Sequence, residues 1–179
     1  MPAEHAILGL LAESDPGAHG YDLARHFASE APLGAIVRLE PGMLYHHLKK
    51  LDKAGWVSAT VEQQGVRPPR QVYQLTPSGR EELERWLGAP VERTRELRLD
   101  FLVKLFFAQR LQPERASELI ANQHETLARN LASLRSQQAE MVAKGEDTRD
   151  RAFSINVLEL RAAQTTAALA WLEQLAEEA

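Results

Sequence analysis

The chain has 179 residues, 44% of them hydrophobic and 26% charged, which are ordinary values for one globular domain or for a small domain with a helical extension. It contains no cysteine, which excludes disulfides and thiolate zinc sites. It also lacks an apolar run of the roughly eighteen residues that a membrane helix needs, and its N-terminus does not have the pattern of a signal peptide. We therefore expect a cytoplasmic protein without a membrane partner.

The formal net charge of −4 hides an uneven distribution. Residues 43–80 carry six lysines or arginines and two acids, whereas residues 1–40 carry two arginines and six acids. Lysines on a helix are also typical of an ordinary solvated surface. The proline-containing segment with Arg67 and Arg70 that follows the lysines favours contact with a nucleic-acid backbone.

Two helices are expected at the start of the chain. The first, over 4–12, is apolar enough to be buried, and the second, over 20–28, follows a turn at Pro16-Gly17. We expect the segment 31–35, which contains a proline and a glycine, to break the second helix and lead into the next one.

The third helix is expected over 41–54. Leu44, Leu48 and Leu51 are spaced four and three residues apart and so line one buried face. Pro41 suits a helix start, and Gly55 suits the left-handed position that ends a helix.

Two strands are expected next, over 56–62 and 71–76, because apolar and polar residues alternate there. The segment 63–70 contains Gly65 and two adjacent prolines, so we expect a loop between the strands. Helix, strand, basic loop, strand and helix is the layout of a winged helix-turn-helix. In that layout the helix enters the major groove and the wing contacts the adjacent backbone.

This layout assigns roles to the residues of the third helix and the wing. Gly42 allows close approach of the backbone, and Met43 and His46 read base edges. The side chains expected to contact phosphates are Lys49, Lys50, Arg67 and Arg70. The neighbouring His46 and His47 point about 100° apart on a helix and cannot share a metal.

The rest of the chain is expected to be helical. A helix over 80–87 ends at Gly88-Ala89-Pro90, so we predict a winged helix-turn-helix domain over 1–88 and a helical dimerisation domain over 89–179. The fold class is mainly α with a small two-stranded β-wing. A strongly apolar helix over 97–109 is expected to be enclosed on several sides.

A long helix from Gln112 toward Gly145 carries a heptad pattern, which is typical of a coiled-coil seam. The residues of this seam are Ile120, Leu127, Leu134 and Met141, with His124, Leu131 and Gln138 interleaved. The two polar members either determine pairing or lie at the wet edge of the seam.

The last expected helix, over 151–177, has two apolar stripes. One contains Phe153, Val157, Leu160, Ala167 and Trp171, and the other contains Leu158, Leu169, Leu172 and Ala176. Two stripes need two partners, which are the long helix of the same chain and a second subunit. We therefore expect a homodimer whose two-fold axis matches a palindromic operator.

Patterns typical of enzymes are missing from the sequence. It has no Gly-x-Ser-x-Gly elbow, no phosphate-binding glycine loop and no dinucleotide fingerprint. His124-Glu125 begins like a zinc-protease motif, but the second histidine is missing. We expect no catalytic residues, no metal and no cofactor.

Five motifs in register resemble the PadR family of transcriptional regulators. They lie at 7–11, 20–23, 41–45, 67–76 and 79–87, and the tail resembles the longer-tailed branch of that family. The resemblance covers essentially the whole chain. It implies a DNA-binding regulator that is usually a repressor, with Tyr45 donating its hydroxyl to a phosphate. A tyrosine that only fills space beside Leu48 remains the alternative.

The resemblance also implies a small aromatic or phenolic effector held between the DNA-binding domain and the tail helices. The candidate pocket residues are Trp86, Phe101 and Phe107, for which a plain core role is the alternative. Two other functions remain open. One is a winged-helix module that binds an acidic protein, and the other is a ligand sensor with auxiliary DNA binding.

Overall fold

The computed structural model describes residues 2–14, 16–64, 67–143 and 149–178, and its chain forms two compact units. The first unit comprises Met1–Ala89 and Arg98–Pro113, and the second comprises Pro90–Leu97 and Glu114–Ala179. The chain therefore passes between the units three times. None of the helices in the described ranges is long and apolar enough to span a membrane.

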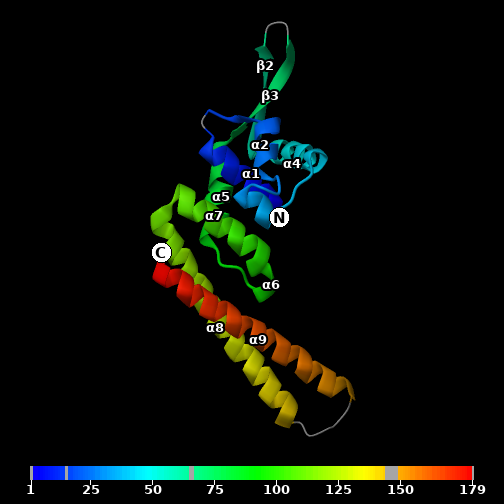
Figure 1. Ribbon diagram of the computed structural model, residues 1–179, viewed down its shortest axis with the longest axis vertical. Coiled ribbons are helices and arrows are strands. Elements are labelled where there is room, and N and C mark those ends of the chain that lie inside the picture. Colours follow the sequence, from blue (N-terminus) through cyan, green and yellow to red (C-terminus); the bar gives the residue numbers. More distant parts are fainter. Residues whose placement is uncertain (1, 15, 65–66, 144–148, 179) are drawn as a thin grey trace. The chain divides into compact units, whose positions relative to one another are not determined.

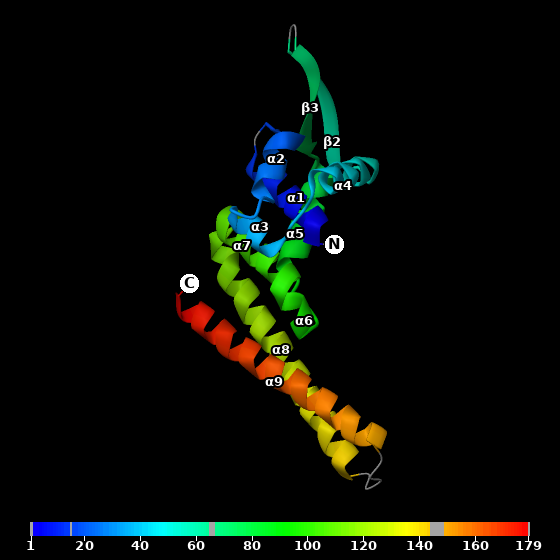
Figure 2. The same cartoon turned by 45° about the vertical axis from the view of Figure 1, so that its right-hand side comes forward.

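The first unit contains most of the secondary-structure elements. They are α1 (Pro2–Glu13), β1 (Ala18–His19), α2 (Gly20–His26), α3 (Pro32–Ile36), α4 (Pro41–Lys53), β2 (Val57–Gln64), β3 (Arg67–Leu75), α5 (Pro77–Gly88) and α7 (Leu102–Leu111). Figure 1 shows the β2–β3 hairpin extending beyond the helices of this unit, and Figure 2 shows the same hairpin after a turn of 45°. This arrangement of helices and a projecting hairpin is a winged helix-turn-helix.

Helix α1 lies in the core of the first unit, because every residue from Glu4 to Leu11 is buried. Helix α7 contributes Val103 and Phe107 to the same core. The Phe107 ring lies against Gly9, where an added Cβ would come within 2.6 Å of the ring. Helix α7 therefore packs with the winged helix, although it follows residue 88. The predicted division into domains at that residue stays a prediction.

The predicted two-stranded wing, formed by β2 and β3, is confirmed, and in the described residues a third strand, β1, extends its sheet. All pairs are antiparallel and the order is β1-β3-β2. Strand β1 is only two residues long and pairs Ala18 with Tyr73 and His19 with Val72. Two residues are too few to show the alternation of apolar and polar side chains that predicts a strand. Strand β1 is recognised only from its pairing with β3.

The prediction of a loop over 63–70 was wrong at both ends, because both strands extend into this segment. Strand β2 continues to Gln64 and β3 already begins at Arg67, with an irregularity in register between Glu62 and Gln64. Two prolines thus lie inside β3. The amides of adjacent strand residues point to opposite edges. One proline faces the edge that β1 leaves unpaired here, and the other lies opposite the irregularity in the pairing with β2.

The helices of the winged domain follow the sequence prediction closely. Gly55 has φ of +76° directly after α4, as expected of a residue that ends a helix. The segment 31–35 was expected to break the second helix and lead into the next one. It does separate the two, but Pro32–Ile36 form the short helix α3, with Ala31 as its N-cap. Pro32 stands at the first position of α3, where a proline costs no hydrogen bond.

The second unit is built on two long helices, α8 (Pro113–Ala143) and α9 (Arg149–Glu178), which run antiparallel and side by side (Figure 1, Figure 2). It also contains the short helix α6 (Thr94–Glu96), and a π-helical turn, η1 (Leu97–Phe101), leads from it into the first unit. Both predicted tail helices are confirmed to within two residues at their described ends.

Residues 90–97 are bound to the long helices by polar side chains. Gln123 is fully buried, and its amide both donates to the carbonyl oxygen of Val91 and accepts from the Val91 amide. Asn130 donates to the carbonyl oxygen of Glu92 at 2.6 Å. Gln123 thus supplies the two hydrogen bonds that a strand partner would otherwise make.

Candidate nucleic-acid interface

Helix α4 separates into a buried face and an exposed face, as its residue spacing predicts. Leu44, Leu48 and Leu51 are at most 1% exposed. The exposed face carries five of the residues expected to contact DNA, namely Gly42, Met43, Tyr45, His46 and Lys49. An added Cβ at Gly42 would meet no atom within 4 Å, so this end of α4 is open to an approaching molecule.

Lys50 is exposed but already has a partner in the first helix. Its ammonium group donates to Oε1 of Glu4 at 2.6 Å, and Nδ1 of His47 lies 3.2 Å from the same oxygen. Glu4 and His47 are buried, so α1 and α4 are joined by a polar contact between buried side chains.

The Glu4 carboxylate is stabilised in its charged form. Burial alone would raise its pKa, but the hydrogen bonds from Lys50 and His47 and the charge of Lys50 bring the pKa below its ordinary value of 4.5. The Lys50 charge is therefore partly neutralised within the protein. Sequence reasoning missed this contact, since Glu4 lies 46 positions before Lys50.

Tyr45 has an intermediate environment. Its side chain is 48% exposed, yet one edge of the ring lies against Gly20, where an added Cβ would come within 2.6 Å of Cε1 and 2.9 Å of the hydroxyl. Tyr45 is thus held in place by the start of α2 without being enclosed. This position leaves its hydroxyl available to a ligand at the surface.

A groove of about 590 Å³ lies between the start of α2, the Tyr45 side chain of α4 and the base of the wing. It is lined by His19, Gly20, Tyr21, Asp22, Tyr45, Arg70, Gln71 and Tyr73. The groove brings together Tyr45 and Arg70, which the sequence assigned to phosphates from separate motifs. It also adds Tyr21, whose side chain is 72% exposed.

The base of the wing is partly acidic. Glu62 faces Arg70 across the β2–β3 pair, and Nε2 of His19 lies 3.7 Å from the Glu62 carboxylate. Arg70 is exposed, and the side chain of Arg67 lies outside the described part of the structure. Opposite charges on facing strand positions attract, so Glu62 lowers the net positive charge available at this end of the groove.

The aromatic residues proposed for an effector are packed rather than open. Phe101 and Phe107 are fully buried, and neither lines the groove described above or the cavity described below. The indole of Trp86 is half-buried and stacks on the ring of His5, with centroids 4.4 Å apart and an interplanar angle of 9°.

A buried lysine lies over the same indole ring. Nζ of Lys104 is 4.6 Å from the Trp86 ring centroid and donates hydrogen bonds to the carbonyl oxygens of Trp86 and Ala89. Lys104 is only 3% exposed, and burial lowers its pKa from 10.5 to about 8. Sequence reasoning passed over it because it lies within an apolar run.

The residues expected at a dimer interface divide into two groups. Ile120, Leu127, Leu131 and Leu134 are at most 8% exposed in a single chain. In contrast, Phe153, Val157 and Leu160 on α9 are 69%, 39% and 60% exposed, while Met141 and Trp171 are half-buried. In the other stripe of α9, Leu158 and Leu172 are buried within the chain, Leu169 is half-buried and Ala176 is exposed.

Two family models match this chain. The description "Transcriptional regulator PadR-like family" applies to residues 7–85, and "Virulence activator alpha C-term" applies to residues 97–179. The negative transcriptional regulator PadR of Bacillus subtilis is 30% identical over 145 residues, which cover 80% of this chain and 76% of the relative. A probable transcriptional regulator of Mycobacterium tuberculosis, Rv1176c, is 37% identical over 95 residues, covering 53% of this chain and 48% of that protein.

Two solved structures are among those similar to this chain. A crystal structure of Bacillus subtilis PadR in complex with operator DNA is 26% identical and covers 98% of this chain and 97% of that chain, with a TM-score of 0.47. A structure of the same protein with p-coumaric acid covers 98% and 93% at 27% identity, with a TM-score of 0.40.

The fold and the exposed helix face define a regulator of the winged helix-turn-helix class. Sequence comparison identifies the particular group: the chain belongs to the PadR family of transcriptional regulators. It is therefore a transcriptional regulator and not an enzyme.

Proposed function

We propose that this protein binds a palindromic operator as a homodimer in the cytoplasm and represses transcription until an effector binds. The observation that carries the proposal is the groove in which Tyr45 of α4 and Arg70 of the wing lie together. Repression is supported by the Bacillus subtilis relative, which is named a negative transcriptional regulator.

In this proposal α4 is the recognition helix. Met43 and His46 on its exposed face read base edges, and Gly42 permits close approach. Phosphates are held by Lys49, Tyr45 and the two wing arginines, Arg67 and Arg70. Lys50 makes a weaker contribution because its ammonium group already binds Glu4.

The dimer is supported by the stripe of α9 that the single chain leaves uncovered. Phe153, Val157 and Leu160 are large apolar side chains at helical spacing, and apolar patches of this kind mark interaction surfaces. A second copy covers the stripe by a two-fold contact in which each α9 contributes the same residues. Such a dimer places two recognition helices on one duplex.

An aromatic or phenolic effector is the regulator that family membership favours. Of the three aromatic candidates, Trp86 alone is partly exposed, and the cation of Lys104 lies over its ring. Phe101 and Phe107 are assigned to the core, where both are fully buried.

The test is fluorescence anisotropy with the duplex upstream of the gene for this protein, measured at several salt concentrations against a scrambled duplex. Tight binding to the natural sequence that weakens steeply with salt is expected. Arg70→Ala should weaken binding to all duplexes and reduce the salt slope by about 1. Arg135→Ala, at an exposed position of α8, is the matched control and should leave both unchanged.

Equal and weak binding to every duplex in a genome-wide selection would refute the proposal. A basic face that binds an acidic protein would then be the better account of α4. His46→Ala separates two roles on the helix: it should change preference among operators, whereas an equal loss on all sequences would reassign His46 to the backbone.

A further inference from the structure

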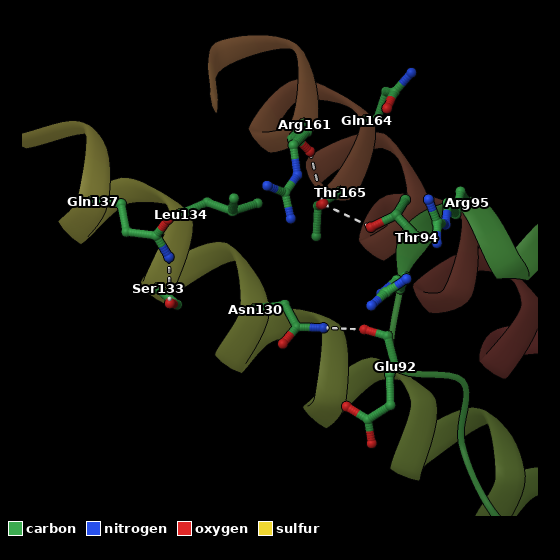
Figure 3. A pocket seen from close by; sticks show the side chains of 11 residues that line it. Glu92, Thr94, Arg95, Asn130, Ser133, Leu134, Gln137, Arg161, Gln164 and Thr165 are labelled. Carbon is green, nitrogen blue, oxygen red and sulfur yellow. Dashed lines mark hydrogen bonds between the residues drawn. The ribbon is translucent and has the colours of Figure 1, made fainter. Parts of the chain in front are cut away.

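The second unit contains a cavity of about 860 Å³ that no part of the proposed DNA contact uses. Its walls come from three segments: residues 92–95, the middle of α8 and the middle of α9. Figure 3 shows the side chains of these segments around it, with those of α8 and α9 on separate ribbons. All of the lining residues belong to the second unit.

The walls of this cavity are cationic. Arg93, Arg95 and Arg161 line it, together with a single acid, Glu92. In the described part of the chain, no carboxylate lies within salt-bridge distance of any of the three guanidinium groups. All three arginines are exposed, and like charges that line one hollow raise the local concentration of anions there.

The other lining groups are mostly polar, and several are fixed by hydrogen bonds. Thr165 is 1% exposed, its hydroxyl donates to the carbonyl oxygen of Arg161, and it lies 2.8 Å from the hydroxyl of Thr94 (Figure 3). On the α8 side Gln137 donates to the Ser133 hydroxyl at 3.1 Å. These hydrogen bonds hold part of the polar lining in place, and Leu134 adds apolar surface to it.

We propose that this cavity binds a small organic polyanion, a molecule that carries two or more carboxylate or phosphate groups. Guanidinium groups bind such oxyanions through paired N–H donors. Two anionic groups suit the site because the arginines come from two walls, Arg93 and Arg95 from the segment before η1 and Arg161 from α9. The ligand bridges these walls.

The position of the cavity gives the ligand a route to regulation, and this step rests on the proposed function. Residues 91 and 92 are bound to α8 by Gln123 and Asn130, and Thr94 is bound to α9 by Thr165. A polyanion held by Arg95 and Arg161 strengthens the same attachment. The segment continues directly through η1 into α7, which belongs to the winged-helix unit.

Binding is tested by isothermal titration of the full-length protein with citrate and, separately, with pyrophosphate, in a buffer of low ionic strength. Saturable binding of at least one of them is expected, and the two titrations distinguish carboxylate from phosphate ligands. Arg161→Gln and Arg95→Gln should each weaken binding by tenfold or more. Arg135→Gln, which removes an exposed arginine of α8 outside the cavity, should bind as the wild type does.

Circular dichroism of each variant checks that the helices remain intact. No saturable heat with either anion overturns the site, and so does equal weakening by all three substitutions, which would indicate only general charge attraction. The site is also overturned if the wild type is a dimer that binds neither anion and Arg161→Gln is a monomer. That result would mean that a second copy of the chain covers the cavity.

The regulatory step has a separate measurement. Operator anisotropy is recorded with and without a saturating concentration of the anion that binds. A change in operator affinity of threefold or more that disappears in Arg161→Gln supports regulation. Unchanged operator affinity would refute the regulatory step. Whether the anion site exists is decided separately, by the titration. Absence of any specific operator overturns the proposed function alone.

Discussion

Replacement of Lys104 by methionine should change how the stability of this protein depends on pH. Lys104 is 3% exposed, with Nζ over the Trp86 ring and hydrogen-bonded to two carbonyl oxygens. Burial lowers its pKa from 10.5 to about 8, while the nearby Asp100 partly opposes the shift and Arg85 adds to it. Methionine fills a similar space and carries no charge.

The sign of the effect follows from which state binds the proton. Between about pH 8 and pH 10.5 the unfolded chain keeps Lys104 protonated and the folded chain does not. The free energy of unfolding therefore rises with pH across this interval. The pKa is lowered by about 2.5 units, and each unit corresponds to about 1.36 kcal/mol, so the free energy of unfolding rises by roughly 3 kcal/mol in total. This gain is absent below about pH 8.

The measurement is urea unfolding of the wild type and Lys104→Met at a series of pH values from 7 to 10, followed by circular dichroism. Other titrating groups cancel in the difference between the two proteins if they do not couple to Lys104. The wild type should gain about 2 to 3 kcal/mol relative to the variant over this range. Lys53→Met, at an exposed position of α4, should show no such trend.

A difference that stays flat within about 0.5 kcal/mol would refute the reasoning. It would mean that Lys104 remains charged and solvated in the folded protein, and that its contact with the Trp86 carbonyl does not enclose it. The cation beside the proposed aromatic effector would then be open to solvent rather than held in the core.

Other substitutions test separate parts of the structure. Glu4→Gln should destabilise the fold by about 1–3 kcal/mol at neutral pH. Because the pKa of Glu4 is lowered, this contribution is present above pH 4.5 and disappears as the pH falls through the folded pKa, so the two proteins should converge in acid unfolding curves. Phe153→Glu combined with Leu160→Glu should give folded monomers in sedimentation, whereas a dimer would remove the α9 stripe from the interface. Gly20→Ala brings a Cβ within 2.6 Å of the Tyr45 ring, so it should weaken operator binding with little change in melting temperature; equal affinity would show that the position of Tyr45 is unimportant.

The parts of the fold that could be predicted from sequence depend on local periodicity. The buried face of α4 follows from Leu44, Leu48 and Leu51, because residues three and four apart share one side of a helix. The remaining positions of α4 must then form its exposed face, which carries most of the residues expected to contact DNA. The stripes of α9 are predictable only in part, because Leu158 and Leu172 are buried whereas Ala176 of the same predicted stripe is exposed.

The parts that sequence reasoning missed depend on contacts between distant residues. Strand β1 exists because Ala18 and His19 pair with β3, and nothing in two residues indicates a strand. The contact of Glu4 with Lys50 joins positions 46 apart. Lys104 interrupts an apolar run, and only the carbonyl oxygens brought to it by α5 explain why a charge is tolerated there. Sequence reasoning also missed the three arginines that line the cavity of the second unit, because they come from segments far apart in the sequence.

The winged-helix unit is discontinuous in sequence, and this has a consequence for the way regulators of this type are divided or recombined. A fragment that stops after α5 lacks α7, and with it the Phe107 ring that fills the space over Gly9. Exchanging the tail of one regulator for another at that point would therefore replace part of the core of the DNA-binding half. A transferable module must carry residues 98–113 with it, so the two halves of such proteins are constrained to change together.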